Sequence, residues 1–224
     1  MIVVDGVSHR LGDQLVLDRV DVALAEQRIG VIGANGSGKS TFARLLNGLV
    51  VPDSGTVTVD GLSTAKDGRE VRRKVGFVFT DPDAQIVMPT VGEDVAFGLR
   101  RSGLPKAEIT ARVRDMLARH GLPGFEDRPA HALSGGEKQL LALCSVLITA
   151  PGTLVCDEPT TLLDLRNARR VGALLAGLPQ RLVLVAHDLD ALADFERVLL
   201  FDAGRLVGDG PPADVVAQYR TAQS

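Results

Sequence analysis

The chain has 224 residues, of which 45% are hydrophobic and 24% charged, the ordinary balance of a globular protein with a full core. Its formal net charge of −3 argues against a nucleic-acid partner, because domains that bind nucleic acid usually carry a basic excess. The start of the sequence lacks the pattern of a signal peptide, and no apolar run approaches the roughly 20 residues that a membrane helix needs. We therefore expect any membrane role to come through a partner.

The first quarter of the chain predicts short strands and one helix. Residues 2–4 and 56–59 are apolar or alternating runs that end at Asp-Gly turn signals, so each is expected to be a strand followed by a tight turn. Residues 28–32 form an apolar strand that runs directly into glycines. Residues 41–49 have helical spacing, and the side chains expected on one face are Phe42, Leu45, Leu46 and Leu49.

Further along the chain, residues 91–122 are helical in pattern and rich in charge, which predicts an inserted helical subdomain with a solvated face. Residues 140–150 are apolar and predict a buried helix. Residues 154–156 and 182–186 are continuous apolar runs, typical of strands buried in a parallel sheet. Residues 198–207 predict a hairpin. Cys144 and Cys156 lie in apolar runs and are expected to be buried free thiols.

Residues 33–40 (GANGSGKS) match the pattern G-x-x-x-x-G-K-[ST] between the apolar strand and the amphipathic helix. Glycines in such a loop allow successive backbone N–H groups to surround phosphate oxygens, and the helix that follows adds its dipole. Lys39 would reach the β- and γ-phosphates, and the hydroxyl of Ser40 would complete a Mg²⁺ shell. The loop alone predicts only that a nucleoside triphosphate binds.

Two carboxylates, Asp157 and Glu158, stand at the end of the apolar strand that includes residues 154–156. In a parallel sheet that end opens on the ligand crevice, so Asp157 can hold Mg²⁺ through water and Glu158 can polarise the attacking water. On its own the pair would also fit a strand that merely ends in polar residues.

Residues 133–139 (LSGGEKQ) place a serine and two glycines at the start of a predicted helix, where a hydroxyl, free N–H groups and a helix dipole create a second anion site. An ordinary helix cap would have the same local pattern. The full LSGGEKQ sequence followed by the acidic pair favours the anion site.

Taken together, these motifs resemble the ABC ATPases over essentially the whole chain. The phosphate loop, the signature at residues 133–139 and the Walker B strand with Glu158 as the catalytic glutamate occur in the family's order. Residues 159–164 (PTTLLD) resemble the D-loop, and His187 matches the switch histidine that contacts the γ-phosphate.

The resemblance implies an α/β fold with a RecA-like P-loop core, an antiparallel β subdomain and a helical subdomain. The whole chain would be one nucleotide-binding domain, with core and β subdomain at about residues 1–80 and 151–224 and the helical subdomain at about 81–150. It also implies that two copies sandwich ATP and Mg²⁺ head to tail, with each phosphate loop facing the partner's signature, and a homodimer is expected. The implied nucleotide contacts are Gly33, Ala34, Asn35, Gly36, Ser37, Gly38, Lys39, Ser40, Thr41, Leu11, Ser134, Gly135, Gly136, Glu137 and Asp164.

Residues 78–98 (VFTDPDAQIVMPTVGEDVAFG) resemble more narrowly the ATPases of energy-coupling-factor (ECF) importers, and most of all those of biotin uptake. Cobalt, nickel or another vitamin remains open as the substrate. The implied partners are a transmembrane coupling protein and a substrate-binding membrane protein, and the implied location is the cytoplasmic face of the membrane. Met88, within residues 85–97, is expected to contact the coupling protein; the alternative is that these residues only pack the helical subdomain.

The sequence departs from the family pattern at three places. Leu11 stands where an aromatic residue usually stacks on adenine, so base selectivity is open. Thr80 stands where a glutamine usually reaches the metal, with Gln85 five residues later; either Thr80 acts through a water or Gln85 takes its place. Leu140 follows the signature where a basic residue is usual.

Other classes fit less well. A chromosome-maintenance or repair ATPase of this family would carry a long heptad insertion, and a translation factor would usually carry two cassettes; neither feature is present. A P-loop kinase would lack the signature and the histidine, and a non-hydrolysing module would lack Glu158 or His187. The alternatives that remain are an ABC ATPase of a non-ECF transporter and, less well supported, a non-transport ABC ATPase.

Overall fold

The computed structural model describes residues 1–223, which form two compact units. The first, here the core unit, comprises Met1–Phe77, Gly152–Glu158 and the chain from Gln180 onward. The second, here the helical unit, comprises Val78–Pro151 and Pro159–Pro179. The segment 159–179, which the sequence assigned to the core, groups with the helical unit because its helix packs on the helix of the signature.

A six-stranded sheet forms the centre of the core unit, in the order β10-β9-β3-β8-β7-β6. Strand β3 pairs in parallel with β8 and β9, β7 pairs in parallel with β8, and β10 is antiparallel to β9. The predicted strands at 154–156 and 182–186 and the hairpin at 198–207 are confirmed. The bounds are Arg28–Gly33 for β3, Val75–Val78 for β6, Thr153–Asp157 for β7, Arg181–Val185 for β8, Arg197–Asp202 for β9 and Arg205–Gly210 for β10.

A second, antiparallel sheet has the order β2-β1-β4-β5. The predicted turn at Asp60-Gly61 is confirmed, since both residues have positive φ and Val59 pairs with Leu62. The predicted end of the first strand at Asp5-Gly6 is wrong: the strand continues through a shift of register there. Gly6 supplies a φ of 57° and its N–H donates to Asp21. The bounds are Ile2–Leu11 for β1, Gln14–Leu24 for β2, Ser54–Val59 for β4 and Leu62–Ser63 for β5.

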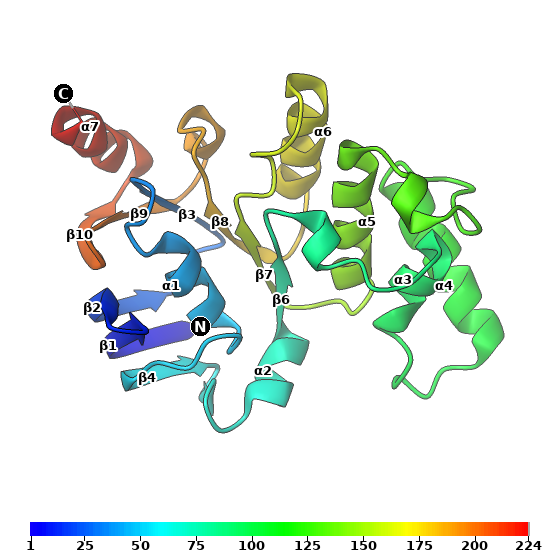
Figure 1. Ribbon diagram of the computed structural model, residues 1–224, viewed down its shortest axis with the longest axis horizontal. Coiled ribbons are helices and arrows are strands. Elements are labelled where there is room, and N and C mark those ends of the chain that lie inside the picture. Colours follow the sequence, from blue (N-terminus) through cyan, green and yellow to red (C-terminus); the bar gives the residue numbers. More distant parts are fainter. Residues whose placement is uncertain (224) are drawn as a thin grey trace. The chain divides into compact units, whose positions relative to one another are not determined.

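Helix α1 (Lys39–Leu46) follows the glycine loop and packs on strands of both sheets, between which it lies in Figure 1. Phe42, Leu45 and Leu46, which were predicted to share one face of this helix, are all buried. The prediction that Leu49 shares this face is wrong, because the helix ends before Gly48, whose φ of 70° leaves the helical region. The other helices of the core unit are α2 (Gly68–Lys74), the 3₁₀ turn η3 (Asp190–Leu192) and α7 (Pro212–Ala222).

Helix α5 (Gly135–Leu147) is central to the helical unit, where it contacts α3, α4, α6 and the 3₁₀ turn η1. Figure 1 shows α3 and α4 (green) beside it. The buried helix predicted at 140–150 is confirmed, and it begins at the signature itself. The charged stretch 91–122 forms two helices, α3 and α4, separated at Gly98–Pro105. The bounds are Pro82–Ala84 for η1, Val91–Phe97 for α3, Lys106–Arg119 for α4, Ala130–Ala132 for the 3₁₀ turn η2 and Leu165–Ala176 for α6.

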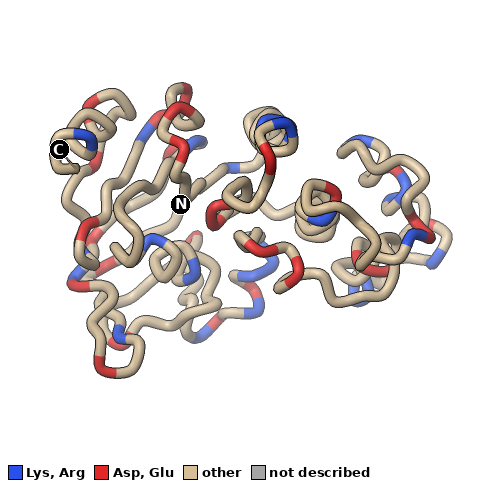
Figure 2. The backbone as a smooth tube through the Cα atoms, turned by 45° about the horizontal axis from the view of Figure 1, so that its top comes forward, with Lys and Arg blue, Asp and Glu red and all other residues tan. Residues whose placement is uncertain are grey.

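Figure 2 shows basic and acidic positions interspersed along the chain, in keeping with the small net charge. None of the helices within residues 1–223 combines the length and the apolar character that crossing a bilayer requires. Cys144 and Cys156 are buried free thiols, as predicted, and burial raises the pKa of Cys144 to about 12.

Candidate functional site

The glycine loop between β3 and α1 needs its glycines for both conformation and space. Gly33, Gly36 and Gly38 have φ values of 146°, 76° and 102°, which residues with a Cβ rarely adopt. A Cβ on Gly33 would lie 2.1 Å from the carbonyl oxygen of Phe201, and one on Gly38 would lie 2.8 Å from that of Val16. The loop therefore lies against two neighbouring strands in a form that side chains would prevent.

A cavity of about 340 Å³ opens on this loop in the core unit. Most of its lining residues belong to the loop and the first turn of α1, where backbone N–H groups can bind phosphate oxygens. The lining residues are Val16, Asn35, Gly36, Ser37, Gly38, Lys39, Ser40, Thr41 and Glu158. Val16, on β2, was missed by the sequence analysis, since nothing in the sequence shows which residue of β2 reaches the loop. Leu11, 74% exposed on β1, is not among these lining residues.

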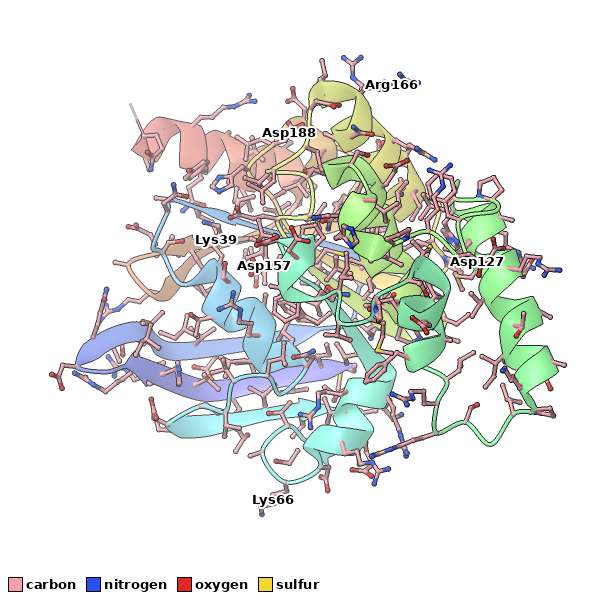
Figure 3. All side chains as sticks on the ribbon, turned by 45° about the vertical axis from the view of Figure 1, so that its right-hand side comes forward. Lys39, Lys66, Asp127, Asp157, Arg166 and Asp188 are labelled. Carbon is pink, nitrogen blue, oxygen red and sulfur yellow. The ribbon has the colours of Figure 1, made fainter. Side chains whose placement is uncertain are left out.

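Lys39 is only 4% exposed, and its ammonium group donates to the carbonyl oxygens of Gly33 and Ala34 at 2.9 Å each. Burial lowers the pKa of Lys39, and the carboxylates of Glu158 and Asp157 oppose that shift. Figure 3 shows the labelled Lys39 and Asp157 near each other in the core unit. A buried ammonium beside a cavity is suited to binding an anion that enters it.

Asp157 ends β7 and is 1% exposed. The hydroxyl of Ser40 donates to its Oδ1 at 2.8 Å, and the guanidinium of Arg44 lies 3.6 Å from its Oδ2. Burial raises the pKa of Asp157, while the Ser40 hydrogen bond and Arg44 act in the opposite direction. Arg44 was also missed by the sequence analysis.

The donor set fits Mg²⁺ bound together with phosphates. Within residues 1–223 no group of three or more His, Cys, Asp and Glu side chains is arranged to hold a metal on its own. Mg²⁺ commonly takes one or two protein oxygens and completes its shell with substrate phosphates and water. Ser40 and Asp157 offer two adjacent oxygens at the edge of the cavity, so this fit is good.

Glu158 follows β7 in a left-handed conformation, with a φ of 51°, which costs a residue with a side chain about 1 kcal/mol or more. Its N–H donates to the carbonyl oxygen of Val185 on β8, and its Oε1 lies 2.9 Å from Nε2 of His187. The glutamate is 15% exposed at the side chain and the histidine 42%. The turn thus brings a carboxylate to the wall of the cavity and pairs it with an imidazole from the next strand end.

In the helical unit, Ser134 and Glu137 form a reciprocal cap at the start of α5. Glu137 accepts hydrogen bonds from the backbone N–H and the hydroxyl of Ser134, at 2.8 and 2.7 Å, which lower the pKa of Glu137. Gly135 is exposed, and a Cβ there would meet open space. The predicted anion site is therefore an exposed and capped helix start.

Asp164 caps α6 by accepting from both the backbone N–H and the side-chain amide of Asn167, at 2.8 and 2.9 Å. The side chain of Asn167 occupies the space beside Gly136, where an added Cβ would lie 2.4 Å from it. The D-loop residue and the signature glycine are thus connected through Asn167, which sequence reasoning missed. Thr80, also in the helical unit, is half-buried after β6.

The structure therefore brings together the glycine loop, Asp157, Glu158 and His187 in the core unit. In the helical unit it brings together the signature residues and Asp164. A family described as ABC transporter matches residues 17–161, and the chain belongs to this family. It is an ABC ATPase.

Three relatives are similar over nearly the whole chain. A putative ABC transporter ATP-binding protein of Deinococcus radiodurans is 56% identical over 98% of this chain and 97% of its own. The biotin transport ATP-binding protein BioM of Rhizobium etli is 53% identical over 96% and 95%. The energy-coupling factor transporter ATP-binding protein EcfA1 of Symbiobacterium thermophilum is 41% identical over 97% and 81%. These relatives confirm the resemblance to ECF-type ATPases and to those of biotin uptake.

Two solved structures share the fold. The cbiO1 protein of Clostridium perfringens, part of an ABC transporter complex named cbiONQ, has a TM-score of 0.84, 30% identity, and coverage of 99% of this chain and 92% of its own. An ATP-binding cassette solved as a dimer after hydrolysis, bound to ADP and phosphate, has a TM-score of 0.82, 25% identity, and coverage of 95% and 99%. The α/β class with an antiparallel sheet and a helical part is thereby confirmed.

Proposed function

We propose that this chain is the ATP-binding and ATP-hydrolysing subunit that energises an ECF-type importer, with biotin as the first candidate substrate. The observation that carries the proposal is the cavity over the glycine loop, which has Lys39, Ser40 and Glu158 in its wall. Asp157 stands behind Ser40, and His187 stands beside Glu158. These groups supply what phosphoryl transfer to water needs: a phosphate cradle, metal ligands and a base.

The loop from Gly33 to Thr41 would hold the phosphates with its backbone N–H groups, and Lys39 would exchange its carbonyl partners for phosphate oxygens. Mg²⁺, held by Ser40 and Asp157, would neutralise charge on the phosphates. Glu158 would orient the attacking water and accept its proton. His187 would keep the Glu158 carboxylate in place and contact the γ-phosphate.

A second copy would complete each site. Ser134, Gly135, Gly136 and Glu137 of one copy would face the phosphate loop of the other, because an exposed helix start with a hydroxyl suits the γ-phosphate. Asp164 would support that surface through Asn167. The proposed arrangement is a head-to-tail homodimer, which the dimeric cassette described above supports.

Two departures from the family pattern stay as predictions. Leu11 would offer the base only apolar contact, so we expect weak selection between adenine and guanine. Thr80 would reach the metal through a bridging water.

The biotin assignment rests on resemblance. The names of two relatives, from Rhizobium etli and Rhodobacter capsulatus, specify biotin transport, and the cbiO1 structure is described as part of a transporter complex. We infer that a transmembrane coupling protein and a substrate-binding membrane protein are the partners, at the cytoplasmic face of the membrane. Docking is assigned to residues 85–97, where Val87 and Phe97 are exposed apolar side chains and Met88 is half-exposed.

The test is uptake by the cell that makes this protein. Removing the chain should abolish uptake of labelled biotin, and wild-type protein should restore it. The Glu158→Gln variant should fail to restore uptake although it is produced and binds ATP. Uptake of labelled cobalt and nickel provides the matched comparison. Loss of cobalt or nickel uptake with biotin uptake intact would make that metal ion the substrate in place of biotin. Unchanged uptake of all three would contradict each of these substrates and leave another vitamin as the substrate of an ECF importer.

A further inference from the structure

In the helical unit, both backbone polar groups of Phe79 face glutamine side chains. The N–H of Phe79 donates to Oε1 of Gln85 at 3.2 Å. Its carbonyl oxygen accepts from Nε2 of Gln139, the last signature residue, in a long hydrogen bond of 3.4 Å. Phe79 immediately precedes Thr80, so the backbone that positions Thr80 is held from two sides.

The same segment is attached to α5 by two further contacts. The second end of the Gln85 amide, Nε2, donates to the carbonyl oxygen of Ala142 at 3.0 Å. The ammonium of Lys138 pairs with both carboxylate oxygens of Asp83, at 2.7 and 2.9 Å. We call this set of contacts the clasp; it consists of Phe79, Asp83, Gln85, Lys138, Gln139 and Ala142.

Packing alone does not account for Gln139. Its side chain is 1% exposed, yet within the described residues its Oε1 has no hydrogen-bond partner. Burying an amide whose oxygen lacks a hydrogen-bond partner costs folding free energy that an apolar side chain of similar size would not cost. The polar side chain therefore requires a reason other than stability, and contact with the Phe79 carbonyl provides one.

Both ends of the Gln85 side-chain amide are engaged in hydrogen bonds. Its amide oxygen and nitrogen are both used inside the helical unit, on Phe79 and on Ala142. A role as metal ligand would have to use Oε1, the same oxygen that accepts from Phe79. This geometry favours Gln85 as a link between segments over Gln85 as a substitute for Thr80.

We propose that Gln85 and Gln139 are positioning residues that make residues 79–85 and the first turns of α5 move as one body. The inference rests on the proposed function in one respect: the helix start at Ser134 is engaged by ATP on a second copy. That engagement is then transmitted through the clasp to Thr80 and to the docking segment that begins at Gln85.

The first experiment needs no nucleotide. Amide hydrogen exchange, resolved by NMR at low denaturant, should give Phe79 and the first turns of α5 the same opening free energy. In Gln85→Met the Phe79 amide should exchange at least about tenfold faster while α5 keeps its protection. Gln218→Met is the matched control, because Gln218 also donates to a backbone carbonyl, that of Val207 in the core unit. Unchanged exchange at Phe79 in Gln85→Met would overturn the clasp.

The second experiment adds ATP in the Glu158→Gln background. ATP should alter exchange at Ser134–Glu137 and at residues 79–85 together, and Gln85→Met should remove only the second change. If Gln85 had a merely structural role, Gln85→Met would lower stability but would not separate the exchange response at Ser134–Glu137 from that at residues 79–85. A response to ATP at residues 79–85 that persists in Gln85→Met would overturn the proposal. If Gln85→Met does not fold, Asp83→Asn takes its place, because it weakens the ion pair with Lys138 at the exposed side of the clasp. The charge swap Asp83→Lys with Lys138→Asp should then restore the exchange response at residues 79–85.

The two experiments separate this inference from the function on which it rests. If ATP changes nothing at Ser134–Glu137 in the parent, the head-to-tail dimer is wrong. The exchange of the Phe79 amide without nucleotide then still decides whether the clasp exists.

Discussion

At Glu158 the backbone takes a left-handed turn directly after a completely buried strand, and the side chain pairs with His187 at 2.9 Å. The strained turn and the pairing have the same consequence, since both fix the carboxylate at the cavity wall. Strain at a residue with a side chain persists only where surrounding contacts require it, and here the bond from the Glu158 N–H to Val185 is one such contact.

We predict that His187→Ala lowers ATP turnover about 10²-fold or more, because the base loses the partner that orients it. ATP binding should weaken far less than turnover, since only the contact of His187 with the γ-phosphate is lost while Lys39 and the loop still hold the phosphates. Single-turnover hydrolysis and equilibrium binding of ATP measure the two effects. His131→Ala, at an exposed histidine of the helical unit, is the control. Normal turnover in His187→Ala would show that Glu158 is held by other contacts.

At this scale the sequence predicted the residue types of the site but not all of their contacts. The loop, Asp157, Glu158 and His187 stand in motifs with fixed spacing, so they could be found without a structure. Arg44 and Val16 could not, because each reaches the site through the packing of α1 or β2. Asn167 becomes important only because Gly136 leaves room for it.

Among the elements, α5 carries the signature on its capped N-terminus. Helix α3 also has a capped N-terminus, but no nucleotide contact is predicted there. Thr90 caps α3 through its hydroxyl, which accepts from the N–H of Glu93 and donates to the carboxylate of that glutamate. The two helices therefore allow the structural role of a cap to be separated from a role in ATP hydrolysis.

We predict that Ser134→Ala and Thr90→Ala each lower the free energy of unfolding by about 1 kcal/mol, the usual cost of losing a helix cap. Only Ser134→Ala should also reduce ATP turnover, because only that hydroxyl is proposed to face a phosphate. Ser134→Thr should restore both properties. Urea unfolding and ATPase rates, measured on the same samples, test this. If Thr90→Ala loses as much turnover as Ser134→Ala, the effect on activity comes from stability alone.

Element boundaries were predicted less well than element types. The sequence predicts that the strand at residues 2–4 ends at the Asp5-Gly6 turn signal. In the structure β1 continues past these residues with a shift of register. The helix at 41–49 was extended to Leu49 because an apolar residue fell at the right spacing, whereas Gly48 had already ended it. In both cases a glycine with positive φ was the deciding residue, and its neighbours in space determined whether the strand or helix continued.

For the whole molecule, the decisive property is that one chain carries one phosphate loop and one signature, in different units. If the site is shared between two copies, a defect in either motif inactivates it, and defects placed on different copies complement each other. Lys39→Ala removes the ammonium at the loop, and Ser134→Arg blocks the signature.

The most direct test is therefore to mix these two inactive variants and measure Mg²⁺-dependent ATP hydrolysis. Half of randomly formed dimers are mixed, and each mixed dimer has one intact site, so we predict recovery of about a quarter of wild-type activity. Two differently tagged copies report that mixed dimers form. A mixture that forms such dimers with ATP and remains as inactive as either variant alone would contradict the shared site.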